Sequence, residues 1–291
     1  MTAAEPATVA AALARGIERL RASSASARYD ATLLLAHAAG RDAAWLLAHA
    51  DDPVEAAIAR RFAAALERRA AGEPVPYVIG VAGFFGRRFA VDARVLVPRP
   101  ETEGAVEAVL AHVRASGAAA SRLCDVGTGS GAIAIALACE LPGARVDALD
   151  VSEAALAVAR GNARAHGVSD RVAFALGAGL RGAGATGPYD AIVANLPYVR
   201  SADLAAAPDP TSFEPRVALD GGADGLAAYR DLLRDAPAAL APGGCLVMEA
   251  GPDTVPALAA LARAAFPDGA RVRTERDLAG LDRLVIVTAA A

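Results

Sequence analysis

From Arg122 to the end of the chain, short apolar runs with the composition of strands alternate with longer segments of helical periodicity. The segments predicted to be strands are Arg122 to Val126, Arg145 to Leu149, Val172 to Leu176, Ala191 to Ala194, Cys245 to Glu249, Arg271 to Glu275 and Arg283 to Thr288. Helices are predicted between them, notably over Ala132 to Glu140, Glu153 to His166, Gly225 to Leu240 and Val255 to Ala265. Such alternation is typical of an α/β fold with a parallel, doubly wound sheet.

The N-terminal part of the chain has a different character. From about Thr8 to Ala71 it is rich in Ala, Leu and Arg, with apolar residues at helical spacing. Gly40 and Pro53 interrupt this pattern as helix ends do. We therefore expect a small helical domain of four or five helices over residues 1–74, a linker over residues 75–97 and a larger domain over residues 98–291.

The linker region contains short runs of β-branched and aromatic residues that glycines interrupt, namely Tyr77 to Gly80, Phe84 to Val91 and Arg94 to Val97. These runs predict a β-hairpin that joins the two domains. The two prolines of the segment Pro98 to Glu103 exclude a continuing strand. Glu101 or Thr102 is expected to begin a helix that runs to Arg114.

Composition narrows the class of protein. With 291 residues, of which 55% are hydrophobic, the chain can form one large domain and a smaller one. All 29 basic residues are Arg, and the net charge of -4 gives no global attraction to nucleic acid. The three cysteines, Cys124, Cys139 and Cys245, lack metal-binding spacing, so we expect reduced core residues in a cytoplasmic protein without a metal. Neither a signal peptide nor a membrane segment is predicted, and we expect no membrane partner.

A glycine-rich segment joins the first predicted strand of the larger domain to its first helix. Its residues Asp125, Gly127, Thr128, Gly129, Ser130 and Gly131 can bring the backbone and the N-H groups of a helix N-terminus close to a ligand. Asp150, at the end of the next strand, is placed to bind ribose hydroxyls, although Ser152 and Glu153 leave a helix N-cap as its alternative role. Since Asp125 would repel a pyrophosphate and suits an amino group, the pattern favours S-adenosyl-L-methionine over NAD.

Asn195-Leu196-Pro197-Tyr198 follows another predicted strand, at the edge where open α/β sheets bind ligands. An amide, a stiff proline and a flat aromatic ring can together hold a planar group that bears an NH2. The alternative roles are a strand-ending cap for Asn195 and core packing for Tyr198.

These motifs occur together with others in a set that is similar to one family. The set consists of Gly72-Glu73-Pro74 with Tyr77 and Gly80, Phe84 and Phe89, Val97 to Glu103, Asp125 to Gly131, Asn195 to Tyr198, and Phe213-Glu214-Pro215 with Ala218, Leu219 and Gly222 to Gly225. It resembles the PrmC/HemK family of protein-glutamine N5-methyltransferases, which modify class I peptide chain release factors. The resemblance implies a class I S-adenosylmethionine-dependent methyltransferase fold, a seven-stranded sheet with an antiparallel last strand, and N-terminal helices that help to dock the release factor.

The resemblance also implies roles for individual residues. The side-chain oxygen of Asn195 and the carbonyl of Leu196 would accept the N-H bonds of a glutamine amide, while Pro197 and Tyr198 complete its site. The candidates for substrate contact are Phe84, Arg99 and Glu101. The alternative for Phe84 is packing in the core of the hairpin, and the alternative for Arg99 and Glu101 is an ion pair with each other. For Glu214 we favour loop anchoring. Ala178 and Gly179, like Asn195, are expected at the cofactor.

Two residues depart from the family pattern. Leu196 replaces a proline of the family's usual motif and adds an N-H. Ala178 stands where the family commonly has an Asp that contacts the adenine amino group.

The resulting prediction is N5-methylation of the Gly-Gly-Gln motif of class I release factors by a monomeric enzyme without direct nucleic-acid binding. Because the Asn-Leu-Pro-Tyr sequence also occurs in rRNA dimethyladenosine methyltransferases, adenine N6-methylation of nucleic acid stays an alternative. Glutamine methylation of a ribosomal protein, and a binding protein that has lost turnover, are the others.

Overall fold

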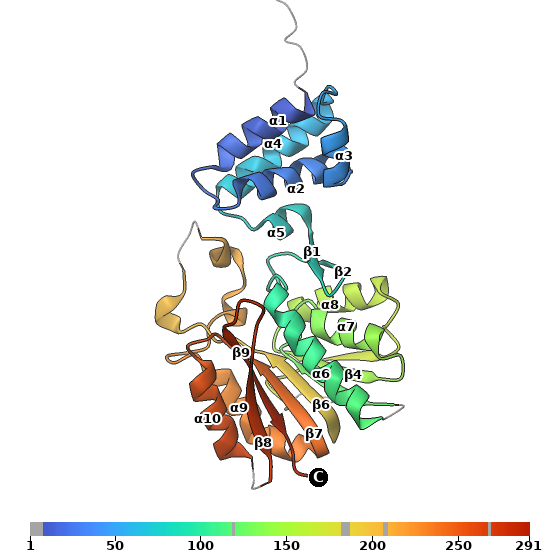
Figure 1. Ribbon diagram of the computed structural model, residues 1–291, viewed down its shortest axis with the longest axis vertical. Coiled ribbons are helices and arrows are strands. Elements are labelled where there is room, and N and C mark those ends of the chain that lie inside the picture. Colours follow the sequence, from blue (N-terminus) through green and yellow to red (C-terminus); the bar gives the residue numbers. More distant parts are fainter. Residues whose placement is uncertain (1–7, 118–119, 182–186, 206–208, 267–268) are drawn as a thin grey trace, which may run out of the picture. The chain divides into compact units, whose positions relative to one another are not determined.

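The computed structural model describes residues 8–117, 120–181, 187–205, 209–266 and 269–291 (Figure 1). These residues form two compact units. The first unit lies within Met1–Val81 and Ala205–Phe213, and the second lies within Ala82–Leu204 and Glu214–Ala291. Each unit is described by itself.

The first unit is helical, as the apolar spacing of its sequence predicts. Its helices are α1 (Val9–Leu20), α2 (Ala27–Ala39), α3 (Ala43–Ala48), α4 (Ala56–Ala70) and α5 (Val75–Ile79), with a short 3-10 helix η3 (Pro210–Phe213). Thr8 and Asp42 cap α1 and α3 by accepting backbone N-H groups, and Gly40 ends α2 in a left-handed conformation. The apolar faces of α1 to α5 pack into one core that contains Leu34 and Phe62.

The predicted hairpin is confirmed, but it is shorter than expected. It consists of β1 (Val81–Phe84) and β2 (Arg87–Ala90), and Phe85 and Gly86 form its turn with positive φ angles of 49° and 68°. Positive φ at both central turn residues suits the twist of a two-residue hairpin.

Two runs that we assigned to this linker are not strands, so those predictions are wrong. Tyr77 to Ile79 belong to helix α5, which has Pro76 in its first turn and ends at Gly80 with φ 76°. The side chains of Tyr77 and Val78 are buried all the same, and Ile79 is half-buried, because β-forming residues can pack equally well on a helix. The run from Arg94 to Val97 has no ladder partner, and the N-H of Val97 donates instead to the carboxylate of Glu214 at 2.9 Å.

The second unit is built on a seven-stranded sheet. The strands are β3 (Arg122–Val126), β4 (Arg145–Asp150), β5 (Val172–Leu176), β6 (Tyr189–Asn195), β7 (Leu240–Glu249), β8 (Arg271–Arg276) and β9 (Asp282–Thr288). Their order is β5-β4-β3-β6-β7-β9-β8, and β9 alone runs antiparallel to both of its neighbours. The predicted doubly wound sheet and its antiparallel last strand are confirmed.

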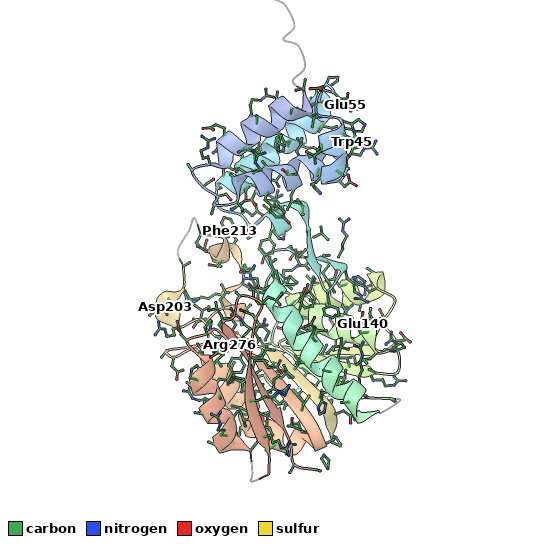
Figure 2. The ribbon with its side chains drawn as sticks, viewed as in Figure 1. Trp45, Glu55, Glu140, Asp203, Phe213 and Arg276 are labelled. Atoms are coloured by element: carbon green, nitrogen blue, oxygen red, sulfur yellow. The ribbon has the colours of Figure 1, made fainter. Side chains whose placement is uncertain are left out.

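Helices cover both faces of this sheet (Figure 1). They are α6 (Glu103–Ser116), α7 (Ala132–Glu140), α8 (Glu153–Ala165), α9 (Ala227–Ala239) and α10 (Val255–Ala265), with 3-10 turns η1 (Pro100–Thr102), η2 (Ser201–Asp203) and η4 (Arg216–Ala218). One apolar cluster joins α6 and α7 to the sheet, and a second joins α9 and α10 to it. Glu140, the last residue of α7, is labelled in Figure 2. It pairs with Arg87 of the hairpin at 2.9 Å.

The strand order determines where a ligand can bind. The chain moves outward from β3 through β4 to β5 and then returns to place β6 on the other side of β3. At this switch point the loops that follow β3 and β6 diverge, which leaves a crevice at the carboxyl edge of the sheet. The glycine-rich segment follows β3, and Asn195 ends β6.

The side chain of Asn162, on α8, connects the hairpin to the glycine-rich loop. Its Nδ2 donates to the carbonyls of Ser130 at 2.8 Å and Ala90 at 3.1 Å, and its Oδ1 accepts the N-H of Ala90 at 2.8 Å. A buried amide with all these partners satisfied holds the two segments in a fixed arrangement.

Among the residues that the structure describes, no helix combines the length and the apolar character that crossing a membrane requires.

Candidate active site

The glycine-rich loop adopts a conformation that only glycine tolerates well. Gly127, Gly129 and Gly131 have φ angles of 78°, 55° and 81°. A Cβ on Gly127 would lie 2.8 Å from the Leu196 side chain, whereas a Cβ on Gly129 would meet no atom within 4 Å. The loop therefore packs against the Asn-Leu-Pro-Tyr segment at its first glycine and presents bare backbone to open space at its second.

Asp125 supports this loop from inside the protein. It is fully buried, and its Oδ2 accepts the hydroxyl of Thr128 at 2.7 Å and the N-H of Ala134 at 3.1 Å. Its Oδ1 has no hydrogen-bond partner among the described residues. Burial raises the pKa of Asp125 to about 7. The direct contact of Asp125 with a ligand amino group stays a prediction.

Asp150 lies at the end of β4, where its carboxylate faces the loop. One oxygen accepts the N-H of Gly129 at 2.8 Å and the other accepts the N-H of Ser152 at 2.9 Å. The N-cap of α8 is Ser152, which accepts the N-H of Ala155 at 3.2 Å, so the alternative capping role of Asp150 is wrong. Burial raises the pKa of Asp150 as well.

A cavity of about 380 Å³ lies at this edge of the sheet. The predicted site residues that line it are Gly127, Gly129, Asp150, Ala178, Gly179, Asn195, Leu196 and Pro197. Those that do not line it are Asp125, Thr128, Ser130, Gly131, Tyr198, Phe84, Arg99 and Glu101. The linker residues Arg94 to Leu96, the loop residues Pro215, Val217 and Ala218, and the carboxylates Asp220 and Asp231 also line it.

Asn195 has a defined partner at the cavity edge. Its Nδ2 donates to the hydroxyl of Thr102 at 3.1 Å, and in the sheet it lies opposite Glu249 of β7. The side chain is therefore more than a strand-ending cap, because it joins two segments of the second unit.

The backbone of Leu196 is held by Tyr229 of α9. The N-H of Leu196 donates to the Tyr229 hydroxyl at 3.1 Å, and the same hydroxyl lies 3.2 Å from the Leu196 carbonyl. It also donates to the carbonyl of Glu249. Tyr229 is fully buried, and burial raises its pKa well above the usual value.

Gly221, in the loop before α9, allows that loop to pack closely on the Asn-Leu-Pro-Tyr segment. A Cβ on Gly221 would lie 2.6 Å from the carbonyl oxygen of Pro197. Tyr198 packs partly into the apolar cluster around α9 and α10, beside Gly251, and burial raises its pKa. Core packing, the alternative role of Tyr198, accounts for this part of its ring.

The structure corrects two expectations, the substrate contact of Phe84 and the ion pair between Arg99 and Glu101. Phe84 is only 2% exposed and packs against Phe89 with ring centroids 6.1 Å apart, so it has no surface to offer a substrate. The ion pair of Arg99 is formed with Glu214, at 2.5 Å, rather than with Glu101. Glu214 also accepts the N-H of Val97, and this agrees with an anchoring role. Substrate contact by Arg99 and Glu101 stays a prediction.

Three residues of the site were not singled out in the sequence. Thr102 lies inside a recognised motif but was considered only as a helix start. Glu249 ends a predicted strand beside that of Asn195, a position that signals a site residue in a parallel sheet. Nothing in the sequence around Tyr229 indicates a site residue, because its spacing is that of any buried residue of an amphipathic helix.

Two family models match the chain, the PrmC N-terminal domain over residues 11–80 and the methyltransferase small domain over residues 101–207. A release factor glutamine methyltransferase from Bordetella pertussis is 45% identical over 88% of this chain and 93% of its own length. One from Cereibacter sphaeroides is also 45% identical, over 94% of this chain and 96% of its own length. A methyltransferase structure from Pyrococcus furiosus has a TM-score of 0.51 at 16% identity, covering 72% of this chain and 92% of that chain.

The fold and the match to the methyltransferase small domain define a class I methyltransferase. Identity over nearly the full length of its relatives decides the family. The chain belongs to the release factor glutamine methyltransferases.

Proposed function

We propose that this protein transfers a methyl group from S-adenosyl-L-methionine to the side-chain nitrogen of the glutamine in the Gly-Gly-Gln motif of class I release factors. The observation that carries the proposal is the position of Asn195 and Leu196 on the wall of the cavity that the glycine-rich loop also lines. The names of the relatives support the substrate class.

The residues around the cavity fit S-adenosyl-L-methionine. A side chain at Gly129 would occupy cavity space, so the bare loop leaves room for a ligand at close approach. Asp150 offers a carboxylate on the cavity wall for ribose hydroxyls. Asp125 is fully buried and does not line the cavity, and it supports the loop through its bonds to Thr128 and Ala134. When bound, the cofactor supplies an electrophilic methyl group on a sulfonium. Ala178 offers no side-chain acceptor to the adenine amino group.

The protein's own contribution is to orient a poor nucleophile. The lone pair of a glutamine nitrogen is delocalised into its carbonyl, so catalysis depends on position. The Oδ1 of Asn195 and the carbonyl oxygen of Leu196 accept the two N-H bonds of the substrate amide and aim its nitrogen at the methyl group. As the new N-C bond forms, the bond between the methyl carbon and the sulfonium sulfur would break and leave a neutral thioether. The nitrogen would release one proton to solvent, so no strong base is required.

The remaining assignments belong to the same proposal. Residues 1–74 act as the docking domain for the release factor, residues 75–97 as the linker and residues 98–291 as the catalytic domain. The enzyme acts as a cytoplasmic monomer without binding nucleic acid directly.

Mass spectrometry of an intact release factor incubated with the enzyme and S-adenosyl-L-methionine tests the proposal. We expect a mass increase of one methyl group, located on the Gly-Gly-Gln glutamine. A homologous release factor methyltransferase serves as the positive control. Transfer only to a ribosomal protein or to adenine in RNA would replace the proposal with one of those activities, and cofactor binding without transfer to any of them would identify a binding protein.

A further inference from the structure

Three residues from separate segments of the second unit meet at the cavity wall, where Asn195 lines the cavity and the other two do not. Thr102 ends η1, Asn195 ends β6, and Glu249 ends β7 directly opposite Asn195 in the sheet. Thr102 is 4% exposed and Glu249 is 1% exposed. The Nδ2 of Asn195 donates to the Thr102 hydroxyl at 3.1 Å. Hydrogen bonding by the Thr102 side chain lowers the pKa of the Glu249 carboxylate, whose Oε2 has no partner among the described residues.

The chemistry of these groups gives the chain of hydrogen bonds a direction. A hydroxyl has one proton to donate, and an ionised carboxylate can only accept. The Thr102 proton must therefore point to Glu249, which leaves the hydroxyl oxygen free only to accept. Its partner in Asn195 has to be the NH2 group rather than the carbonyl, as the structure has it.

We propose that Glu249 is a positioning residue that, through Thr102, sets the orientation of the Asn195 amide so that its oxygen faces the substrate. The inference rests on the proposed function, since it concerns the amide that receives the glutamine. If the amide were reversed, its NH2 would face the NH2 of the substrate and one of the two acceptors would be lost.

The same direction predicts a dependence on pH. A protonated Glu249 can donate to Thr102, and the hydroxyl proton can then turn to the oxygen of Asn195. The groups that face Glu249 are Arg283 on β9, Arg99 and Glu101 at η1, Tyr198 after β6 and Tyr229 on α9. The two arginines have carboxylates of their own, at Asp277 and Glu214. Burial is the larger effect and raises the pKa of Glu249 to about 7, so the constraint holds on the basic side of neutrality.

Three variants of the full-length enzyme test the inference at saturating S-adenosyl-L-methionine. Thr102→Val removes the hydroxyl and keeps the shape, and we expect kcat/KM for the release factor to fall about tenfold. Thr102→Ser restores the hydroxyl and should recover most of the activity. Glu249→Gln presents either an oxygen or an NH2 to Thr102, so we expect a several-fold loss and disappearance of the rise in kcat/KM near pH 7.

Two outcomes would overturn the inference. One is a Thr102→Val enzyme with normal kcat/KM, and the other is a Glu249→Gln enzyme that keeps the rise near pH 7. A purely structural role would lower thermal stability in all three variants without a change in the pH profile.

A measurement without substrate separates this inference from the proposed function. In nitrogen NMR spectra, the Asn195 NH2 signals should shift as Glu249 titrates, and they should not shift with pH in Thr102→Val. If this shift occurs and the release factor is not methylated, the positioning stands and the assigned substrate is wrong. If methylation occurs without the shift, the opposite holds.

Discussion

The hydroxyl of Tyr229 lies within hydrogen-bonding distance of both backbone polar groups of Leu196, 3.1 Å from the nitrogen and 3.2 Å from the carbonyl oxygen. A proline at position 196 would have no N-H for this hydroxyl to accept. Tyr229 thus satisfies the buried donor that the replacement of proline by leucine introduces.

A double-mutant cycle checks this relationship. Tyr229→Phe should lower the free energy of unfolding by about 2 kcal/mol, because it leaves the buried N-H of Leu196 without an acceptor. The loss should be about 1 kcal/mol smaller in a Leu196→Pro background, where that N-H is absent. Urea unfolding of the four proteins measures the coupling, and strictly additive losses would contradict it.

Asn195→Ala should reduce kcat at least a hundredfold, since it removes an acceptor of the substrate amide. The fold should be retained, because Asn195 lies at the end of its strand and the substitution removes one side-chain hydrogen bond, to Thr102. Turnover measured by mass spectrometry, with circular dichroism and thermal unfolding as controls, checks both expectations. Retained turnover would exclude Asn195 from the mechanism.

Ala178→Asp should increase the affinity for S-adenosyl-L-methionine about tenfold, because it adds a charged acceptor at a position of the cavity wall whose alanine side chain offers none. Ala178→Leu, which adds similar bulk without an acceptor, should not increase it. Isothermal titration calorimetry of both variants measures the difference. Equal affinities would mean that the adenine amino group lies elsewhere.

Gly127→Ala should weaken cofactor binding, because its Cβ would lie 2.8 Å from the Leu196 side chain at a φ of 78°. The loop would be strained, and the side chain of Leu196 would have to move away from the new methyl group. Gly161→Ala is a matched control, because a Cβ there meets only the end of Arg164, 3.9 Å away, and alanine favours the helix by about 1 kcal/mol. Calorimetry and thermal unfolding should separate the two variants, and equal behaviour would argue against close packing at Gly127.

The stability of the enzyme should fall as the pH rises from about 4 to about 7. Burial raises the pKa of Asp125 and of Glu249 to about 7, so in this range the folded protein binds more protons than the unfolded chain. Each group then lowers the free energy of unfolding by about 1.4 kcal/mol per pH unit, and the effect levels off above pH 7. Asp125→Asn and Glu249→Gln should each flatten the slope in urea unfolding series. A slope unchanged in both variants would contradict the assigned pKa values.

Much of the fold could be predicted because the apolar runs of a buried parallel sheet are clear in the sequence. Strands β3 and β5 and helices α7 and α10 have the predicted bounds. The start of β7 at Leu240 was missed, since Pro242, Gly243 and Gly244 look like a turn, and the pairing with β6 is irregular there.

The ligand-facing residues of the site were largely predictable, whereas their supports were not. Asn195 and Asp150 follow strands, so their location can be inferred from the sequence alone. Thr102, Tyr229 and Glu249 reach the motif from distant segments, and only the packing of η1, α9 and β7 brings them together. Phe84 was misjudged because an aromatic residue has the same local pattern in a core as in a binding wall.

The hydrogen bonds of Asn162 to Ala90 and Ser130 couple the hairpin to the glycine-rich loop. A ligand that orders the loop therefore also favours the ordered hairpin, by the free energy that couples the two segments. Thermodynamic linkage is reciprocal, so whatever fixes the hairpin in place tightens the hold of the loop on its ligand to an equal extent.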